Sequence, residues 1–262
     1  MKIQYASDLH LEFPENRKFL KENPLKPASD VLVLAGDIGY LAEYALYADF
    51  WDYVSANFRE TIIAIGNHEL YTYFDLADIS GGLTMTIRPN VKAYYNAVVR
   101  IENVDFIVST LWAKIPMVDA YVTEKGVNDF YRIMYKGKRL SYNVFNEEHE
   151  RCLDFIKKSM ASTTLSHRSL SEVETKIVVV THHVPSFALS SPDFAGSRIN
   201  GAFTTELGDY ISDSNIDYWI YGHSHRNIDR TIGNTKCVSN QLGYISHNEH
   251  LSFMNDKIIE IE

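Results

Sequence analysis

The sequence predicts an α/β (α+β) fold, and three features of its pattern point to mixed sheets with helices packed against them. The first third alternates short apolar, β-branched runs with amphipathic runs, as βαβ units do. The middle contains two strand-like runs joined by two residues, which is typical of an antiparallel hairpin. Polar clusters follow five of the apolar runs, and open α/β sheets build their sites beyond the carboxyl ends of strands.

The N-terminal third is predicted to hold three strands and two helices. The strands cover residues 3–6, 31–35 and 61–65, where apolar and β-branched residues dominate. A short helix is expected around residues 14–22, and a longer amphipathic helix around residues 42–57. This alternation predicts parallel strands connected by helical crossovers.

The middle of the chain departs from that pattern. Residues 96–101 and 104–110 read as strands that flank Glu102-Asn103, a two-residue turn. From residue 112 to residue 140 the periodicity is lost and the composition becomes aromatic and basic, which predicts a long irregular loop. A substrate-pocket rim and a plain surface loop with buried aromatic residues explain this segment equally well.

The C-terminal half returns to regular structure. A helix is expected from about Ser141 to Met160, followed by an exposed connection rich in serine and threonine over residues 159–171. A strand over residues 177–180, a helix over 204–212 and strands near Asp217, Ile228, Lys236 and Leu251 complete the pattern. No linker separates two units, so residues 1–262 are expected to form a single domain, in which residues 112–140 can be a substrate-rim insertion.

Composition narrows the classes of function. The 262 residues are 45% hydrophobic, which is ample for a core, and 25 basic against 34 acidic residues give a net charge of −9. That charge disfavours general binding of nucleic acid.

Cys152 and Cys237 are too few for a disulfide framework or a thiolate metal site. Neither an export signal nor a membrane-spanning run is present, so a cytoplasmic location without a membrane partner is expected. No feature of the sequence indicates the oligomeric state.

Five polar clusters carry the candidate chemistry. They are Asp8-Leu9-His10, Gly36-Asp37, Gly66-Asn67-His68-Glu69, Thr181-His182-His183 and Gly222-His223-Ser224-His225. Residues two apart in a strand point the same way, so Asp8 with His10, and His223 with His225, can each present two ligands to one place. A carboxylate such as Asp37 can bridge two cations, and neutral imidazoles suit zinc, manganese or iron. The mixture indicates two transition-type ions.

Taken in this order, the clusters resemble the motifs of the calcineurin-like metallophosphoesterase superfamily. That resemblance implies a four-layer αββα sandwich of two mixed β-sheets flanked by helices. It also implies a first metal held by Asp8, His10 and His225, a second held by Asn67, His182 and His223, and a bridging Asp37. Adjacent residues of an extended backbone face opposite sides, so His183 is expected either to support a ligand or to lie at the surface. Glu69 is expected to be structural, and His149, His167, His247 and His250 to be surface residues.

The resemblance implies an enzyme that uses two divalent cations, of manganese, iron or zinc, to hydrolyse phosphomonoesters or phosphodiesters. A metal-activated hydroxide would attack the phosphorus while His68 assists the leaving group. Ser/Thr protein phosphatases of the superfamily carry Gly-Asp-x-x-Asp-Arg-Gly, whereas Tyr40, Leu41 and Ala42 stand at the later positions here. The Asp partner of the catalytic histidine and the phosphate-binding Arg are therefore predicted to be absent. Nucleotides or other small phosphoesters are the expected substrates.

Two other functions fit parts of the pattern. A metal-dependent nuclease could use the aromatic and basic residues of 112–140 to bind a single strand, although the acidic net charge disfavours it. A binding scaffold that has lost its metals would be expected to lose ligands, and this chain keeps the complete set. The segment Asn240 to Tyr244 looks like a variant of an Asn-Pro-Arg-Gly-Tyr segment of some bacterial-type members, and the sequence assigns it no role.

Overall fold

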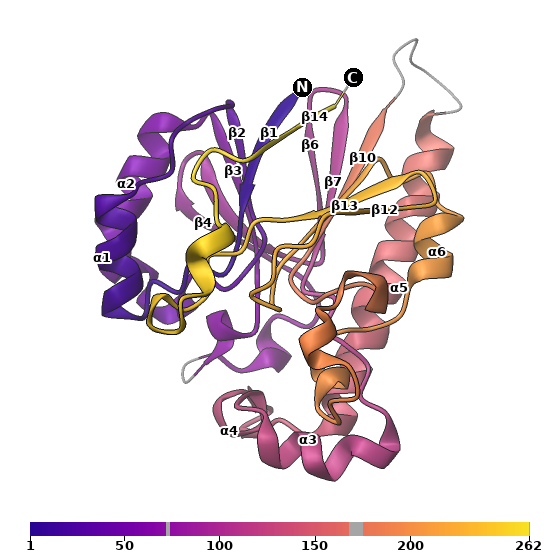
Figure 1. Ribbon diagram of the computed structural model, residues 1–262. Coiled ribbons are helices and arrows are strands. Elements are labelled where there is room, and N and C mark those ends of the chain that lie inside the picture. The colour runs from indigo at the N-terminus through magenta and orange to yellow at the C-terminus, as the bar shows by residue number, and fades with distance from the viewer. Residues whose placement is uncertain (72–73, 168–174, 262) are drawn as a thin grey trace.

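The computed structural model describes residues 1–71, 74–167 and 175–261, and its centre is a pair of facing β-sheets (Figure 1). The first sheet has the strand order β14-β1-β2-β3-β5-β4. Its strands are β1 (Lys2–Ala6), β2 (Val31–Leu34), β3 (Glu60–Ala64), β4 (Leu83–Arg88), β5 (Val91–Tyr95) and β14 (Ile258–Glu260). β1, β2, β3 and β5 are parallel, and an antiparallel strand closes each edge.

The second sheet follows the same plan, with the order β12-β13-β11-β10-β7-β6. Its strands are β6 (Ala97–Ile101), β7 (Val104–Ser109), β10 (Lys176–Thr181), β11 (Tyr218–Tyr221), β12 (Arg230–Ile232) and β13 (Thr235–Ser239). The four central strands are parallel, and β6 and β12 pair antiparallel at the edges. β6 and β7 form the hairpin that the sequence predicts around Glu102-Asn103.

Alternate side chains of the strands enter two different cores, because successive residues of a strand point to opposite faces. In β2, Val31 and Val33 belong to the core between the two sheets, whereas Leu32 and Leu34 belong to the core beneath the helices. The strands of the second sheet divide in the same way between the central core and a third core on their outer face. Each sheet is therefore buried on both faces.

Helices cover the two outer faces (Figure 1). α1 (Pro14–Glu22) and α2 (Ala48–Asn57) lie on the first sheet, while α5 (Tyr142–His167) and α6 (Gly208–Ser212) lie on the second. This arrangement confirms the αββα sandwich. α3 (Ala120–Gly126) and α4 (Asp129–Arg132) lie apart from these layers, at the lower end of the view. Among the residues that the structure describes, no helix has the length and apolar character needed to cross a bilayer.

Several predicted elements differ from the structure in type. The helix expected over residues 42–57 begins as a 3₁₀ helix, Leu41–Tyr47, and only then becomes α2. Leu251 lies in the 3₁₀ helix Glu249–Ser252 rather than in a strand, and the last strand is β14. The helix expected from residue 204 is limited to α6, and strands β4 and β5 were not predicted. The pattern misjudged these short elements because tertiary context, more than local propensity, decides their form.

Two longer segments are also more ordered than predicted. Residues 112–140 contain α3, α4 and a small hairpin of β8 (Met134–Tyr135) and β9 (Lys138–Arg139) rather than an irregular loop. Helix α5 continues to residue 167 through part of the serine- and threonine-rich connection, and residues 168–171 lie outside the described part. Ile156, Met160 and Thr163 are buried along α5, so tertiary packing overrides the weak helix propensity of that composition.

Candidate metal centre

The five polar clusters meet at one end of the sandwich, although up to 217 residues separate them along the chain. Asp8, His10, Asp37 and Asn67 follow β1, β2 and β3 of the first sheet, and His182, His223 and His225 follow β10 and β11 of the second. Six of these seven side chains are buried, and the side chain of His225 is only 11% exposed. The site therefore lies where the two sheets meet.

Three of the residues form a first group around the Nε2 atom of His225. This nitrogen lies 3.0 Å from Nε2 of His10 and 3.4 Å from Oδ1 of Asp8. Asp37 approaches the group as well, since its Oδ2 lies 3.9 Å from Nε2 of His10. The spacing of these atoms allows one cation to contact Asp8, His10 and His225 together.

A second group surrounds the Nε2 atom of His182. Oδ1 of Asn67 lies 2.9 Å away, Nδ1 of His223 lies 3.1 Å away, and Oδ1 of Asp37 lies 3.3 Å away. Asp37 thus turns one carboxylate oxygen towards each group. A carboxylate in this position can be shared by two cations.

The outer hydrogen bonds of the first group leave the inner nitrogens of His10 and His225 to bind a proton or a cation. Nδ1 of His10 lies 2.9 Å from the carboxylate of Glu12, and Nδ1 of His225 lies 2.6 Å from that of Glu249. Each imidazole must donate from Nδ1, because an ionised carboxylate only accepts. The two Nε2 atoms then face one another with their lone pairs across 3.0 Å. Such a contact needs a proton or a cation between the nitrogens.

The second group has the same character. Nδ1 of His182 donates to the carbonyl oxygen of Ala35 at 2.9 Å, so its Nε2 points inward, where it can bind a proton or a cation. The amide nitrogen of Asn67 donates to Oδ1 of Asp129 at 2.9 Å, which turns the amide oxygen towards His182. Nitrogen and oxygen acceptors oriented by outer hydrogen bonds are the usual shell of a divalent transition metal, so these residues fit such ions.

The carboxylates of the site stabilise positive charge on the neighbouring imidazoles. Burial opposes the charged form of His182, but Asp37 and Asp8 outweigh it and raise the pKa of His182 to about 9. Burial is likewise outweighed at His225, where Asp8 and Glu249 raise the pKa to about 10. In Asp37, burial raises the pKa, yet the neighbouring His182 and His68 hold it well below its usual value. The protons on His182 and His225 therefore lie at positions where the surrounding carboxylates stabilise positive charge, as they would stabilise a bound cation.

The backbone is strained around the candidate ligands. Asp8, His10, Asp37, His223 and His225 all have positive φ angles, between 49° and 74°, which side-chain-bearing residues rarely adopt. Such conformations cost on the order of 1–3 kcal/mol each and cluster at functional sites. They also correct one inference from sequence: these pairs converge because the chain turns after each strand, and not through the alternation of an extended strand.

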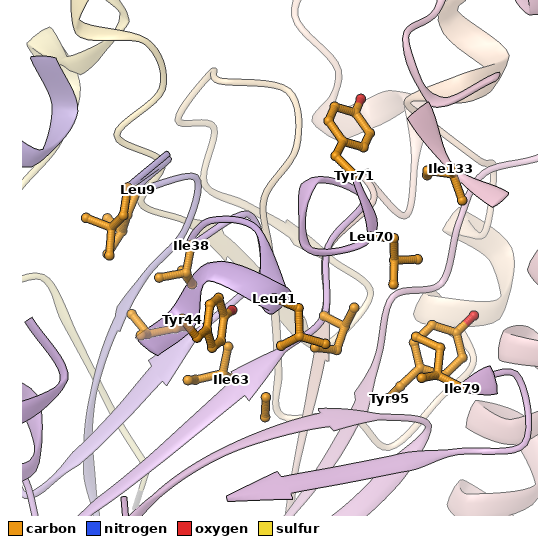
Figure 2. Packing of buried hydrophobic residues seen from close by; sticks show 14 of the residues in the cluster. Leu9, Ile38, Leu41, Tyr44, Ile63, Leu70, Tyr71, Ile79, Tyr95 and Ile133 are labelled. Atoms are coloured by element: carbon orange, nitrogen blue, oxygen red, sulfur yellow. The ribbon is translucent and has the colours of Figure 1, made fainter. Parts of the chain in front are cut away.

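Apolar residues interleaved with the ligands anchor these strained turns. Leu9, Ile38 and Leu70 are fully buried in the core beneath the helices of the first sheet (Figure 2). Each is adjacent to a polar residue of the site or lies within three positions of one. Packing of the apolar neighbours therefore fixes the direction of the polar side chains.

Glu69 holds two of the loops together. Its carboxylate accepts hydrogen bonds from the backbone N–H groups of Asp37, Ile38 and Gly66 and from the hydroxyl of Tyr44. The structural role predicted for Glu69 agrees with these contacts. Gly66 must lack a side chain, because a Cβ there would lie 2.2 Å from Oδ1 and 2.6 Å from the backbone nitrogen of Asp37.

His68 lies beside the two groups and contacts neither of their centres. Its Nδ1 lies 2.6 Å from Oε1 of Glu12, and its Nε2 lies 4.0 Å from Oδ2 of Asp37 and 3.5 Å from the hydroxyl of Tyr244. The ring stacks on Tyr71 with 4.2 Å between centroids. His10, Glu12 and His68 are close enough to hold an ion, but their short contacts join a ring N–H to a carboxylate, so we interpret them as hydrogen bonds.

Sequence reasoning missed the residues that support the site. Glu12, Asp129 and Glu249 orient His10, Asn67 and His225, and Tyr244 lies among the imidazoles at 4.6 Å from the His225 ring. No Asp stands at the position that pairs with the catalytic histidine in the protein phosphatases, and Glu12 supplies a carboxylate to His68 from another loop. The alternation Asp8-x-His10-x-Glu12 was the available signal.

Two other histidines differ from expectation. His149 is 2% exposed and its Nδ1 lies 3.2 Å from the carbonyl oxygen of Leu111, so it is not a surface residue. His183 is fully buried with its ring 4.1 Å from that of His223, which excludes the surface alternative. His247 is exposed as predicted, and the side chain of His167 lies outside the described residues.

Comparisons with known proteins agree with this geometry. The profile of the calcineurin-like phosphoesterase family matches residues 1–227. An uncharacterized protein of Acanthamoeba polyphaga mimivirus is 25% identical over 266 residues, which cover 92% of this chain and 91% of that protein. The crystal structure of a phosphopantetheinyl hydrolase from Mycobacterium tuberculosis superposes with a TM-score of 0.63 at 17% identity, covering 93% of this chain and 89% of that one. At 17% identity, the similarity to this crystal structure shows a shared fold alone.

Proposed function

Because the chain belongs to the calcineurin-like phosphoesterase family and is a phosphoester hydrolase, we propose that it cleaves small phosphoesters with two divalent cations. Asp8, His10 and His225 would hold one cation, Asn67, His182 and His223 the other, and Asp37 would contact both. Bound divalent cations supply positive charge that orients a phosphoryl group and lowers the pKa of water. The observation that carries the proposal is the convergence of acceptor atoms on two centres that share Asp37.

The chain's own residues account for departure of the leaving group. A water oxygen forms a new bond to phosphorus while the bond from phosphorus to the leaving oxygen breaks. His68 gives the proton on its Nε2 to that oxygen, and the water releases a proton to solvent. Burial lowers the pKa of His68, but Asp37 and Glu12 more than compensate and raise it, which favours the protonated ring that a general acid needs.

The substrate class that we propose is nucleotides or other small phosphomonoesters and phosphodiesters. The net charge of −9 disfavours a long polyanion, which supports a small substrate over a nucleic acid. The similar fold of a protein named as a phosphopantetheinyl hydrolase makes phosphopantetheine esters reasonable members of the test set.

Residues 112–140 are proposed as the rim of the substrate pocket, and α4 is the part nearest to the chemistry. Its first residue, Asp129, contacts Asn67, and the guanidinium of its last residue, Arg132, lies 6.0 Å from the ring centroid of Tyr71. Tyr71 in turn stacks on His68. Arg132 is exposed and therefore accessible to an anionic group of a bound substrate.

Hydrolysis assays with added Mn²⁺ test the function. The metal-free protein should be inactive, and Mn²⁺ should restore cleavage of p-nitrophenyl phosphate, bis(p-nitrophenyl) phosphate or both. Asp37→Asn should abolish the metal-dependent rate, because it weakens the carboxylate that both centres share. A folded protein that binds Mn²⁺, Zn²⁺ or Fe²⁺ but cleaves neither these esters, nor nucleotides, nor phosphopantetheine esters would contradict the proposal.

A further inference from the structure

Glu12 contacts both a candidate metal ligand, His10, and the proposed proton donor, His68. Its Oε1 lies 2.9 Å from Nδ1 of His10 and 2.6 Å from Nδ1 of His68. The side chain is only 3% exposed, and its second oxygen, Oε2, has no hydrogen-bond partner in the part of the chain that the structure describes. A buried carboxylate with so few partners is costly, so its two imidazole contacts need an explanation.

Because an ionised carboxylate only accepts hydrogen bonds, Glu12 places a proton on Nδ1 of both rings. For His10, this leaves the Nε2 lone pair directed at the first ligand group. For His68, it directs Nε2 towards the side of the site where Asp37 and Tyr244 lie, at 4.0 Å and 3.5 Å. One oxygen atom therefore sets the ring state of a candidate ligand and of the proton donor.

The surroundings leave Glu12 as the residue that decides how His68 presents its proton. Stacking against Tyr71 holds the plane of the His68 ring but provides no hydrogen bond to Nδ1. The hydroxyl of Tyr71 donates elsewhere, to Asp129 at 2.6 Å. The contact with Glu12 is shorter than the average hydrogen bond, as expected when an acceptor is ionised.

We propose that Glu12 is a positioning residue that holds His68 with its proton-donating Nε2 towards the leaving group. This inference rests on the proposed hydrolysis of phosphoesters. Glu12 itself does not touch the substrate: it acts through His68, and at the same time through His10. The carboxylate that partners the catalytic histidine would thus come from the loop after β1 and not from the segment after Asp37.

Leaving-group dependence separates this role from a merely structural one. A nitrophenolate leaves without a proton, whereas an alkoxide needs one, so loss of the acid harms alkyl esters far more. Glu12→Gln keeps the shape but removes the charge. It should lower kcat on an alkyl phosphoester by about 10²-fold or more and kcat on the matching nitrophenyl ester by less than about 10-fold. His68→Gln should show the same selective loss, and the double variant should add little to it.

Glu249→Gln is the matched control. Glu249 holds Nδ1 of His225 as Glu12 holds Nδ1 of His10, but it does not contact His68. This variant should weaken Mn²⁺ binding and reduce both substrates in the same proportion. An equal loss on both esters in Glu12→Gln would overturn the proposal. Absence of hydrolysis in the wild type would instead overturn the proposed function, so the two failures are distinguishable.

A measurement on the metal-free protein gives an independent readout. Nitrogen-15 NMR of the histidine rings, at a pH high enough for His68 to have released its Nε2 proton, should show the remaining proton on Nδ1 in the wild type. In Glu12→Ala, the ring should move to a mixture that includes the Nε2–H form, and a ring that keeps its proton on Nδ1 would overturn the assignment. If that variant does not fold, Glu12→Gln serves instead, and its Nδ1 proton should shift upfield because the charge-assisted bond is lost. An unchanged proton shift would count against Glu12.

Discussion

His182 and His225 carry protons in the metal-free protein, since their pKa values are raised to about 9 and about 10 by the surrounding carboxylates. A cation that binds these rings must displace the protons, because a metal ligand needs a free lone pair. We therefore expect Mn²⁺ binding near neutral pH to release protons. The affinity should rise with pH until the pKa values of both rings have been passed.

Isothermal titration in two buffers with different enthalpies of ionisation measures that release. Released protons are taken up by the buffer, so the observed heat should differ between the two. Asp105→Asn is a suitable control, because Asp105 lies on β7 and pairs with Arg100 away from the metal centre, and this variant should retain the difference. Identical heats in both buffers for the wild type would show that the imidazoles are already unprotonated.

The roles of some site residues could be predicted from the sequence, and the roles of others could not. The placement of Asp37 and His182 at one centre was implied by the resemblance to the family's motifs, each of which is a few residues long and follows a strand. Glu12 and Glu249 could not be assigned in this way. Their partners lie in other loops, and two acidic residues among 34 carry no mark that distinguishes a buried partner from a solvated one.

Secondary-structure elements also differ in how well the sequence predicts them. The strands that end at the site have continuous apolar runs, which are typical of parallel strands buried on both faces, and they were predicted correctly. Helices α3 and α4 have only seven and four residues, so they are too short to show a helical period or to form without tertiary packing. That is why residues 112–140 were expected to be irregular, although they contain the helix that contacts Asn67.

Helix α4 gives a prediction about substrate binding. Arg132→Ala should raise KM for anionic phosphoesters by about 10-fold, close to the lower end of the roughly 1.5–3 kcal/mol of a hydrogen bond to a charged group, and leave kcat nearly unchanged. The reason is that Arg132 lies one aromatic ring away from His68 and can contact the substrate without touching the reacting atoms. Steady-state kinetics on one ester over a range of concentrations provide the measurement.

Arg139→Ala is the control for that experiment. Arg139 belongs to the same segment and also lies over a tyrosine, Tyr131, at 5.7 Å, but no contact joins this pair to the ligand groups among the described residues. Its KM should equal that of the wild type. If Arg132→Ala also leaves KM unchanged, α4 is not part of the pocket rim and the proposed rim must lie elsewhere in residues 112–140.

At the scale of the whole molecule, the two sheets have the same plan and meet at their ligand-bearing ends. Sequence pattern alone predicted the parallel strands and the β6–β7 hairpin, but it could not divide the strands between two sheets. An apolar run such as residues 177–180 looks the same in either sheet, because both faces of both sheets are buried. The four-layer arrangement followed from the family resemblance instead.

Cations at this junction would connect the two sheets, because each ligand group contains residues from both. The first joins Asp8 and His10 to His225, and the second joins Asn67 to His182 and His223. Binding to the folded state alone stabilises it by mass action, by about 2.7 kcal/mol when the free metal is at 100 times Kd. For a chain of this size, that corresponds to a rise in Tm of about 5–10 °C.

Thermal denaturation with and without Mn²⁺ tests this expectation, and a pair of Asp→Asn variants locates the effect. Asp37→Asn should lose most of the shift, because Asp37 faces both groups. Asp229→Asn should keep it, since Asp229 is half-exposed and pairs with Lys257 at the surface. A metal-induced rise in Tm that survives in Asp37→Asn would mean that the cations bind away from the junction, and the sheets would then be held together by their apolar core alone.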